Sequence, residues 1–485
     1  MQALPQSARQ ASSGKQTDTM PPSVALFLWL VLLCGLLYWD PATAPKTSIA
    51  LWVPVIWMFI LGSRLPSQWI GGQVGMSLQA MEEGNSLDRI ISSGLILMAI
   101  GILVSRSFKL DAFFANNLAL TAFLCFALMS VLWSDYPLIS LKRWLRDLGN
   151  YLVILVALSD PRPPEAIRTL LRRLFFLLIS LSVVLIKYYP EIGKSWDSWT
   201  GVAEYSGVTT GKNMLGVLCL VSGLFFFWDT VARWADRKER RTKRILVNVA
   251  FIAMTLWLLD LSNSATSRVC LVVGCLIIAA AHRKAVKRRP ALLTALIPVG
   301  ISGCLVLAVG FGVDISAAVA KAVGRDPTLT DRTKIWSFLL SMKISPLLGT
   351  GYESFWLGPR LQWFWQHAGL GHINEAHNGC LEVYLNLGII GLSLLGWFLI
   401  ASYRTICRRF KPFSSFGSLS LALWTTLLFH SITEASFRSG LLWLTFLLGA
   451  IAVPERAKIK ALVLDTSAFG TPGPKRCSPA FLWKS

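Results

Sequence analysis

Cationic side chains gather in one long polar segment between two apolar runs, residues 314–376. Arg325, Arg332 and Arg360 lie in it, and a guanidinium group can grip a phosphate through two parallel hydrogen bonds. Acidic and hydroxyl residues at 326–331 precede an apolar helical pattern and resemble a helix N-cap. We therefore expect Arg332 on the first turn of a helix, where backbone N–H groups also attract an anion. An isolated arginine in such a segment could instead contact lipid phosphate.

His377 follows this segment, where the sequence becomes apolar again. Its imidazole can exchange a proton near neutral pH, as a general base must. Helical spacing puts His377, Leu381, Tyr384 and Gly388 on one face of a single helix. A lone interfacial histidine can also be a hydrogen-bonded structural residue. The other candidates for a base on this segment are Glu353, His372 and Glu375.

A third polar element is the glycine-rich stretch 207–213, GVTTGKN, which ends where another apolar helix is expected to begin. Its Lys212 could meet a phosphate, although this stretch alone is a weak signal. The long polar segment also carries many aromatic residues, among them Trp336 and Tyr352. Aromatic planes stack on the C–H faces of sugar rings, but they also form belts that anchor helices at lipid headgroups. Both interpretations stay open for each ring.

The composition indicates what must position these residues. Hydrophobic residues make up 54% of the 485-residue chain and charged residues 15%, against about 25% charged in soluble domains. The mean hydropathy is +0.55, and apolar runs long enough to cross a bilayer recur from Ser23 to Val453. The formal charge of +21 comes from Lys and Arg in short runs between apolar segments, which favours a role in topology over nucleic-acid binding. The sequence predicts an all-α polytopic membrane protein with about twelve transmembrane helices.

The basic loops predict which parts of the chain share a side of the membrane. Loops at 233–244, 282–290 and 404–411 must be cytoplasmic. A helical hairpin at about 246–281 separates the first two loops. Alternation of the later spans then places 314–376 on the extracytoplasmic side as one large loop.

The short apolar piece at 148–159 leaves two alternatives upstream. If it crosses the membrane, there are thirteen helices, and Lys142, Arg143 and Arg146 lie outside. If it does not, there are twelve helices and a cytoplasmic N-terminus, and the same basic residues lie inside. The second alternative obeys the positive-inside rule better, so we expect it.

These spans predict four parts of the chain, of which the last is rich in Gly, Pro, Lys and Ser and is expected to be disordered. They are a cytoplasmic N-terminal tail at 1–22, an N-terminal transmembrane bundle at 23–187, a membrane domain at 188–453 that contains the outer loop 314–376 and the candidate catalytic residues, and a cytoplasmic tail at 454–485.

The polar elements form an ordered set of short motifs. They are GKNMLG at 211–216, SATSR at 264–268, the stretch 324–336, GTGY at 349–352, and His377-Asn378 with nine residues before GIIG at 388–391. In this order they resemble the O-antigen ligase and polysaccharide polymerase superfamily, most closely its exopolysaccharide-production branch. The resemblance is strong from about 200 to 400, and the N-terminal third matches only in hydropathy. In one departure, the family often has an arginine directly before Gly207, where this chain has Ser206.

The resemblance implies a GT-C-like membrane glycosyltransferase in the bacterial inner membrane. Such an enzyme takes a glycan from undecaprenyl pyrophosphate on the periplasmic side and joins it to a glycan or lipid acceptor. The essential arginine and histidine of the family map onto Arg332 and His377, the expected catalytic residues. The residues expected to bind substrate are Lys212, Asn213, Arg325, Trp336, Tyr352, Arg360, Asn378 and Tyr384.

The chemistry of such a reaction needs these residue types. Departure of a lipid pyrophosphate from an anomeric carbon builds negative charge, which a fixed cation such as Arg332 stabilises. The acceptor hydroxyl must lose a proton, and His377 is a suitable base. No D-x-D motif appears, which argues against a metal-held nucleotide sugar. We therefore expect neither a metal nor a cofactor.

A secondary transporter or flippase is the alternative from another class of protein. Transporters tend to show internal repeats, helices broken at matching positions and charges near the membrane midplane, whereas the polar residues here concentrate in one outer segment. The sequence does not separate a ligase from a polymerase, although the branch it resembles favours a polymerase. The other expected partners are the lipid bilayer and further polysaccharide-assembly proteins, not nucleic acid.

Overall fold

The structure is a computed structural model that describes residues 20–39, 48–71, 84–196, 203–234, 241–310, 332–369, 373–410 and 415–453. It is built almost entirely of helices, with one antiparallel pair of three-residue strands, β1 (Lys194–Trp196) and β2 (Ala203–Tyr205). This confirms the prediction of an all-α protein. Arg325, His372, most of the tail at 1–22 and the tail from Pro454 lie outside the described residues.

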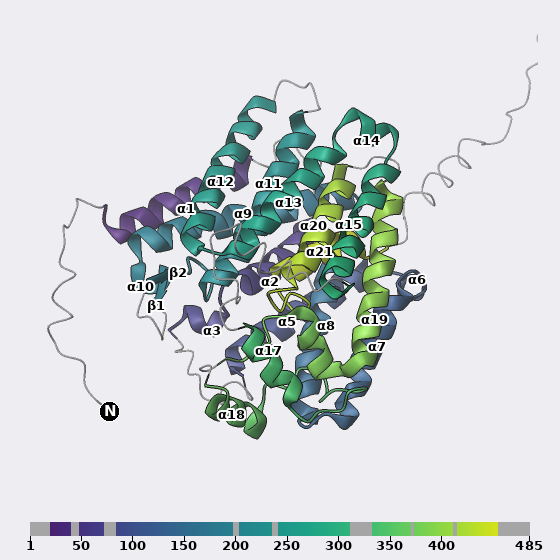
Figure 1. Cartoon of the computed structure of the whole chain (residues 1–485). Coiled ribbons are helices and arrows are strands. Elements are labelled where there is room, and N and C mark those ends of the chain that lie inside the picture. Colours follow the sequence, from purple (N-terminus) through teal and green to yellow (C-terminus); the bar gives the residue numbers. More distant parts are fainter. Residues whose placement is uncertain are drawn as a thin grey trace, which may run out of the picture.

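The helices follow the chain in the order of the predicted apolar runs (Figure 1). They are α1 (Pro22–Trp39), η3 (Ile49–Leu51), α2 (Trp52–Gly62), α3 (Pro66–Trp69), α5 (Ser86–Ser105), α6 (Leu110–Asn116), α7 (Leu118–Met129), η4 (Ser130–Trp133), α8 (Pro137–Leu158), α9 (Pro163–Tyr188), α10 (Pro190–Gly193), α11 (Lys212–Trp234), α12 (Arg241–Ser262), α13 (Ala265–Ala281), α14 (Lys284–Arg288), α15 (Ala291–Gly310), α17 (Arg332–Ser341), α18 (Gly358–His367), α19 (Gly379–Phe410), α20 (Ser415–His430) and α21 (Leu441–Ala450).

Within the described residues, six helices are long and apolar enough to cross a membrane: α1, α5, α9, α11, α12 and α19. A bent pair formed by α6 with α7 and η4, which turns by 99°, would be a seventh. Shorter apolar helices include α13 with 17 residues and α21 with 10 residues. Each predicted apolar run therefore corresponds to a helix, and the chain is a polytopic membrane protein.

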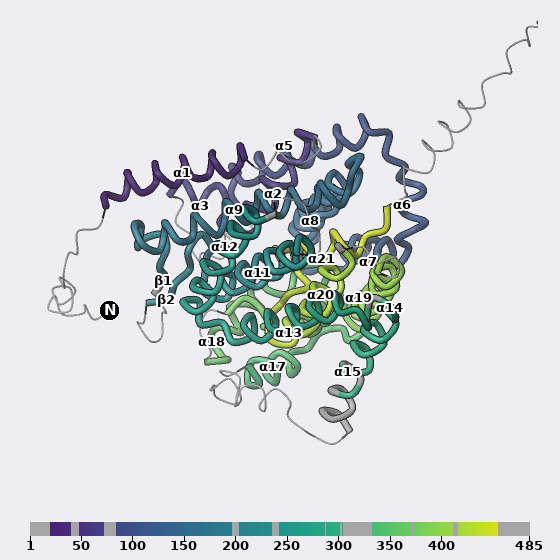
Figure 2. The backbone as a smooth tube through the Cα atoms, turned by 90° about the horizontal axis from the view of Figure 1, so that it is seen from above, coloured from purple at the N-terminus to yellow at the C-terminus, as the bar shows by residue number. Residues whose placement is uncertain are grey.

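Burial separates the central helices from the peripheral ones. In their most apolar 18-residue windows, α9 is 78% buried and α11 is 72% buried, whereas α1 is only 11% buried. Figure 2 accordingly shows α1 and α5 along one edge of the molecule, with α9, α11, α20 and α21 inside it. One hydrophobic core joins residues of α2, α8 and α9 with residues of α11, α20 and α21, so the two predicted membrane parts pack together.

Helix α8 corrects the expected topology. Its 22 residues span about 33 Å at 1.5 Å per residue, the length of a bilayer crossing, but α8 is not among the helices that are also apolar enough to cross a membrane. At its start, Arg143 donates to the backbone oxygen of Glu353, and Asp135 pairs with Arg360 at 2.6 Å. Both partners belong to the predicted outer segment, which includes α18 and lies at the end of the molecule opposite α14 (Figure 1). The expectation that this basic stretch lies across the membrane from the outer segment is wrong, because Arg143 bonds to Glu353 and Arg146 interacts electrostatically with the same residue.

Helix α19 is broken at Gly388, which has φ 65° and ψ −165°. The segment 346–351 enters this break. The N–H groups of Thr350 and Gly351 donate to the oxygens of Leu385 and Asn386 at 3.1 and 2.9 Å. On the other side of the break, the N–H groups of Ile389 and Ile390 donate to the oxygens of Pro346 and Leu347. The outer segment thereby satisfies backbone groups that the break leaves without helical partners.

Close backbone contact explains two of the glycine motifs. A Cβ atom at Gly388 would lie 2.2 Å from the oxygen of Leu347, and one at Gly349 would lie 2.5 Å from the carbonyl carbon of Asn386. Neither position has room for a side chain. The expectation that His377 and Gly388 share a face of one helix is wrong, because α19 begins only at Gly379 and breaks at Gly388.

Candidate functional site

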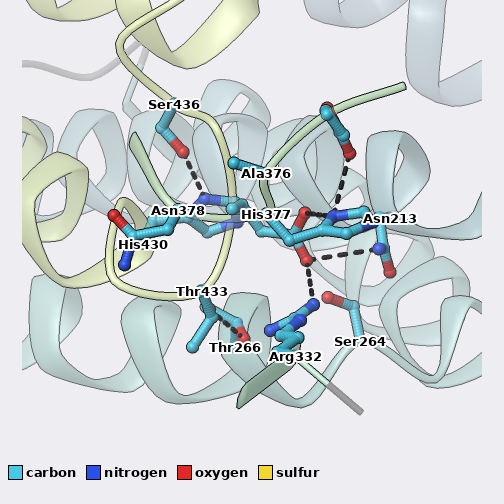
Figure 3. Close-up of polar contacts among 12 residues, drawn as sticks. Asn213, Ser264, Thr266, Arg332, Ala376, His377, Asn378, His430, Thr433 and Ser436 are labelled. Atoms are coloured by element: carbon cyan, nitrogen blue, oxygen red, sulfur yellow. Dashed lines mark hydrogen bonds and ion pairs between the residues drawn. The ribbon is translucent and has the colours of Figure 1, made fainter. Parts of the chain in front are cut away.

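Three residues from separate parts of the chain, Asn213, Arg332 and His377, meet around the carboxylate of Glu434 (Figure 3). Arg332 Nη2 donates to Glu434 Oε1 at 2.7 Å, and Asn213 Nδ2 donates to the same oxygen at 3.2 Å. His377 Nδ1 lies 3.4 Å from Glu434 Oε2 and 2.9 Å from Glu375 Oε1. The predicted catalytic pair and one predicted substrate-binding residue are thus brought together by an acidic residue.

Helices position three of these groups. Arg332 lies on α17, whose described part begins at this residue, and Asn213 is the second residue of α11. Asn378 precedes α19, and its Oδ1 accepts the N–H of Leu381 at 3.0 Å, which is an N-cap contact. His377 comes directly before this cap in the left-handed region, with φ 45°. Non-glycine residues rarely adopt this conformation, so the surrounding contacts must hold it there.

Glu434 lies in the short connection between α20 and α21, which is anchored on both sides. The hydroxyl of Thr433 hydrogen-bonds that of Thr266 at the start of α13, at 2.8 Å. His430 Nδ1 hydrogen-bonds the hydroxyl of Ser436 at 2.7 Å. The SATSR and GKNMLG motifs also pack on each other, because a Cβ atom at Gly216 would lie 2.6 Å from the Cβ of Ser264. These contacts bring α11, α13 and the Glu434 connection close together.

The charges of the cluster balance one another. Burial lowers the pKa of His377, but its hydrogen bonds to Glu375 and Glu434 outweigh burial and raise that pKa to about 9. Burial raises the pKa of Glu375, but the contact with His377 outweighs it and the net shift is downward. At neutral pH the cluster therefore contains an imidazolium, the Arg332 guanidinium and ionised Glu375.

Glu375, His377 and Glu434 also present three potential metal ligands within 4.8 Å of one another. Arg332 and the proton on His377 Nδ1 already occupy the carboxylate oxygens that would face an ion. A divalent cation would have to displace both. The sequence-based expectation that no metal is needed stays a prediction.

Two comparisons with known proteins bear on the resemblance found in the sequence. Residues 249–396 match the family model for O-antigen ligase. The chain is also 26% identical over 380 residues to the exopolysaccharide production protein ExoQ of Rhizobium meliloti (strain 1021), across 74% of this chain and 83% of that protein. Both similarities support a relationship to the O-antigen ligase and polysaccharide polymerase superfamily. This confirms the resemblance found in the sequence, including its exopolysaccharide branch.

The family match contains part of the cluster only. It covers Arg332, Glu375 and His377 but ends before Glu434 and begins after Asn213. The sequence did not indicate Glu434 as a site residue. Glu434 lies among the polar residues between the last two apolar runs, outside the short motifs that carry the resemblance. One feature of the sequence could have indicated Glu434. It is an acidic residue in a connection that the alternation of the spans places on the outer side.

Two predicted phosphate contacts lie away from the cluster in this structure. Lys212 pairs with Glu204 and not with Glu434. Arg360 pairs with Asp135 and stacks over the ring of Phe355 at 5.3 Å. Their roles in substrate binding stay predictions, but a substrate would have to displace these partners. Arg325 lies outside the described residues.

The aromatic residues of the outer segment mostly form a second hydrophobic core. Phe355, Trp356 and Phe364 are at most 5% exposed, and Trp336 and Tyr384 pack against this core. These contacts give the segment a folded body of its own. The sugar-platform interpretation still applies to rings near the surface, such as that of Trp363, which is 44% exposed.

Tyr352 belongs to a second polar cluster that the sequence did not predict. Its hydroxyl donates to Asp147 Oδ2 at 2.9 Å. Next to it, Arg438 makes two contacts with Glu353, at 3.2 and 2.8 Å. Burial raises the pKa of Glu353, but Arg438 and Arg143 outweigh it and lower that pKa. Glu353 is therefore an ionised structural partner, which makes it a poor candidate for the base.

Proposed function

We propose that this protein transfers a glycan from a lipid pyrophosphate donor, undecaprenyl pyrophosphate, to a hydroxyl acceptor on the extracytoplasmic face of the inner membrane. The observation that carries the proposal is the convergence of Arg332 and His377 on Glu434, from positions 102 and 57 residues away in the chain. This arrangement combines a fixed cation with a titratable base at the membrane surface. Those two groups are what the reaction requires.

Arg332 is proposed to bind the leaving group. In the reaction, the acceptor oxygen forms a bond to the anomeric carbon while the bond from that carbon to the phosphate oxygen breaks. The electron pair of that bond leaves with the lipid pyrophosphate, so negative charge grows on the phosphate. The guanidinium of Arg332 favours an anion at this place. Glu434 pairs with Arg332 and would have to yield to the phosphate.

His377 is proposed to take the acceptor proton. Its Nδ1 faces Glu375 and Glu434, so Nε2 is the nitrogen left to face an acceptor hydroxyl. Carboxylates on Nδ1 orient the ring and stabilise the imidazolium that forms, as in other carboxylate–histidine pairs. With a pKa of about 9, the neutral form that can act as a base is the minor one at neutral pH. The proposed base is therefore strong but sparsely populated.

We favour a polymerase over a ligase. The support is the name of the relative, an exopolysaccharide production protein that aligns with 74% of this chain. A polymerase extends a glycan of the same repeat unit, whereas a ligase transfers it to a lipid or protein. Lengthening of the product ladder with time distinguishes the first from the second.

The proposal is tested with purified protein in detergent and a synthetic lipid-pyrophosphate oligosaccharide. Detergent micelles have no compartments, so product formation supports an enzyme and excludes a pure transporter or flippase. Arg332→Lys should lose at least about tenfold in rate, because lysine keeps the charge but not the planar fork. Lys343→Ala, an exposed lysine of the same segment, is the matched control and should keep the normal rate. Normal turnover in Arg332→Lys would overturn the proposed donor site.

A further inference from the structure

Ala376, the residue before His377, is held at both of its backbone groups. Its N–H donates to Glu382 Oε2, and its C=O accepts the indole N–H of Trp336, each at 2.9 Å. Ala376 is fully buried and Glu382 is only 2% exposed. These two contacts fix the peptide that leads into the left-handed conformation of His377. The orientation of the imidazole therefore depends on Glu382 and Trp336.

The other oxygen of Glu382 reaches two further segments. Oε1 accepts the indole N–H of Trp356 at 2.8 Å, which ties it to the core of the outer segment. The same oxygen lies 3.9 Å from Arg438 Nη1, on the connection that also carries Glu434. Arg438 is in turn bound by Glu353. One buried carboxylate thus touches the His377 turn, the outer segment and the Glu434 connection.

We infer that Glu382 is a positioning residue that assembles the site, since it fixes the turn of His377 and, through Arg438, the connection of Glu434. A carboxylate in an apolar helix is costly unless it is fully paired, and apolar residues of similar volume would serve packing as well or better. The site uses both carboxylate oxygens of Glu382, because each accepts a hydrogen bond from a different donor. Glutamine has the same shape but only one acceptor oxygen, so it cannot receive both the Ala376 N–H and the Trp356 N–H.

This inference rests on the proposed role of His377, and the experiment separates the two. Purified Glu382→Gln is compared with wild type for kcat, donor KM and the pH dependence of kcat/KM. We expect kcat to fall by about tenfold to a hundredfold, as for a misplaced catalytic group, with donor KM little changed. The rise of kcat/KM with pH that reports the pKa of His377 should move to lower pH. The reason is that the imidazole loses its contacts with Glu375 and Glu434, which raise that pKa.

Two further variants keep the test decisive. Trp336→Phe removes the hydrogen bond to the Ala376 oxygen and should shift the profile in the same direction, so it decides the matter if Glu382→Gln does not fold. Ser402→Ala, at a buried position farther along α19, is the control and should change neither kcat nor the limb. Unchanged kcat and pH limb in folded Glu382→Gln or Trp336→Phe would overturn the inference. Full activity in His377→Gln would overturn the proposed function itself.

Discussion

Raising the pH from 7 to 9 should increase kcat/KM if neutral His377 is the base. Its contacts with Glu375 and Glu434 outweigh burial and raise its pKa to about 9. Only about one imidazole in a hundred is then neutral at pH 7, by the definition of the pKa. Because kcat/KM reports the groups of the free enzyme, it should rise about tenfold per pH unit from pH 7 and level off above about pH 9.

The assay is the initial rate of glycan transfer at donor concentrations below KM, measured from pH 6 to pH 10. His377→Gln should lower the plateau by about 10² to 10⁴ and remove the limb, since a positioned base contributes about that much. Glu434→Gln should move the limb to lower pH, because one of the two carboxylates on Nδ1 is lost. A flat profile would refute the base role. A rate that falls above pH 9 would show that the imidazolium is the active form, as expected of a phosphate-binding residue.

Three other predictions test the topology, the broken helix and the metal. Cysteines placed at Lys142 and Gln366 should both react with a membrane-impermeant reagent from outside, whereas one at Ala285 should not; protection of Lys142→Cys alone would contradict the position of the start of α8 beside the outer segment. Gly388→Ala should lower the Tm in detergent by several degrees, because its Cβ would meet the Leu347 backbone at 2.2 Å and its φ is 65°, whereas Gly396→Ala on the same helix has open space and should not. Chelation with EDTA should leave the transfer rate within about twofold, since Arg332 and protonated His377 already balance the carboxylates; a loss restored by one divalent cation would show a metal site instead.

The sequence alone was sufficient for the membrane class and for most of the helices. Hydrophobic periodicity and length are local properties, and a bilayer requires every spanning backbone to satisfy its own hydrogen bonds, so each long apolar run becomes a helix. The helix that carries Arg332 was predictable for the same reason, because its apolar pattern is local, whereas the predicted cap at 326–331 lies outside the described residues. The order of the short motifs was also enough to indicate the superfamily.

The position of α8 required the tertiary structure. The positive-inside rule counts Lys and Arg in loops. It does not take into account that a distant segment of the same chain can bind a guanidinium. Arg143 donates to the oxygen of Glu353, 210 residues later in the chain. No local pattern shows such a partner.

The composition of the site was likewise decided by tertiary contacts. Glu434 and Glu382 look like isolated acidic residues in the sequence, and only folding places the first between Arg332 and His377 and the second beneath Ala376. The break at Gly388 has the same origin, because the residues that fill it come from segment 346–351. The role of a carboxylate, or of a carbonyl without a helical partner, depends on which donor lies beside it in the folded protein. That donor is set by the packing of distant segments and not by the spacing of neighbours.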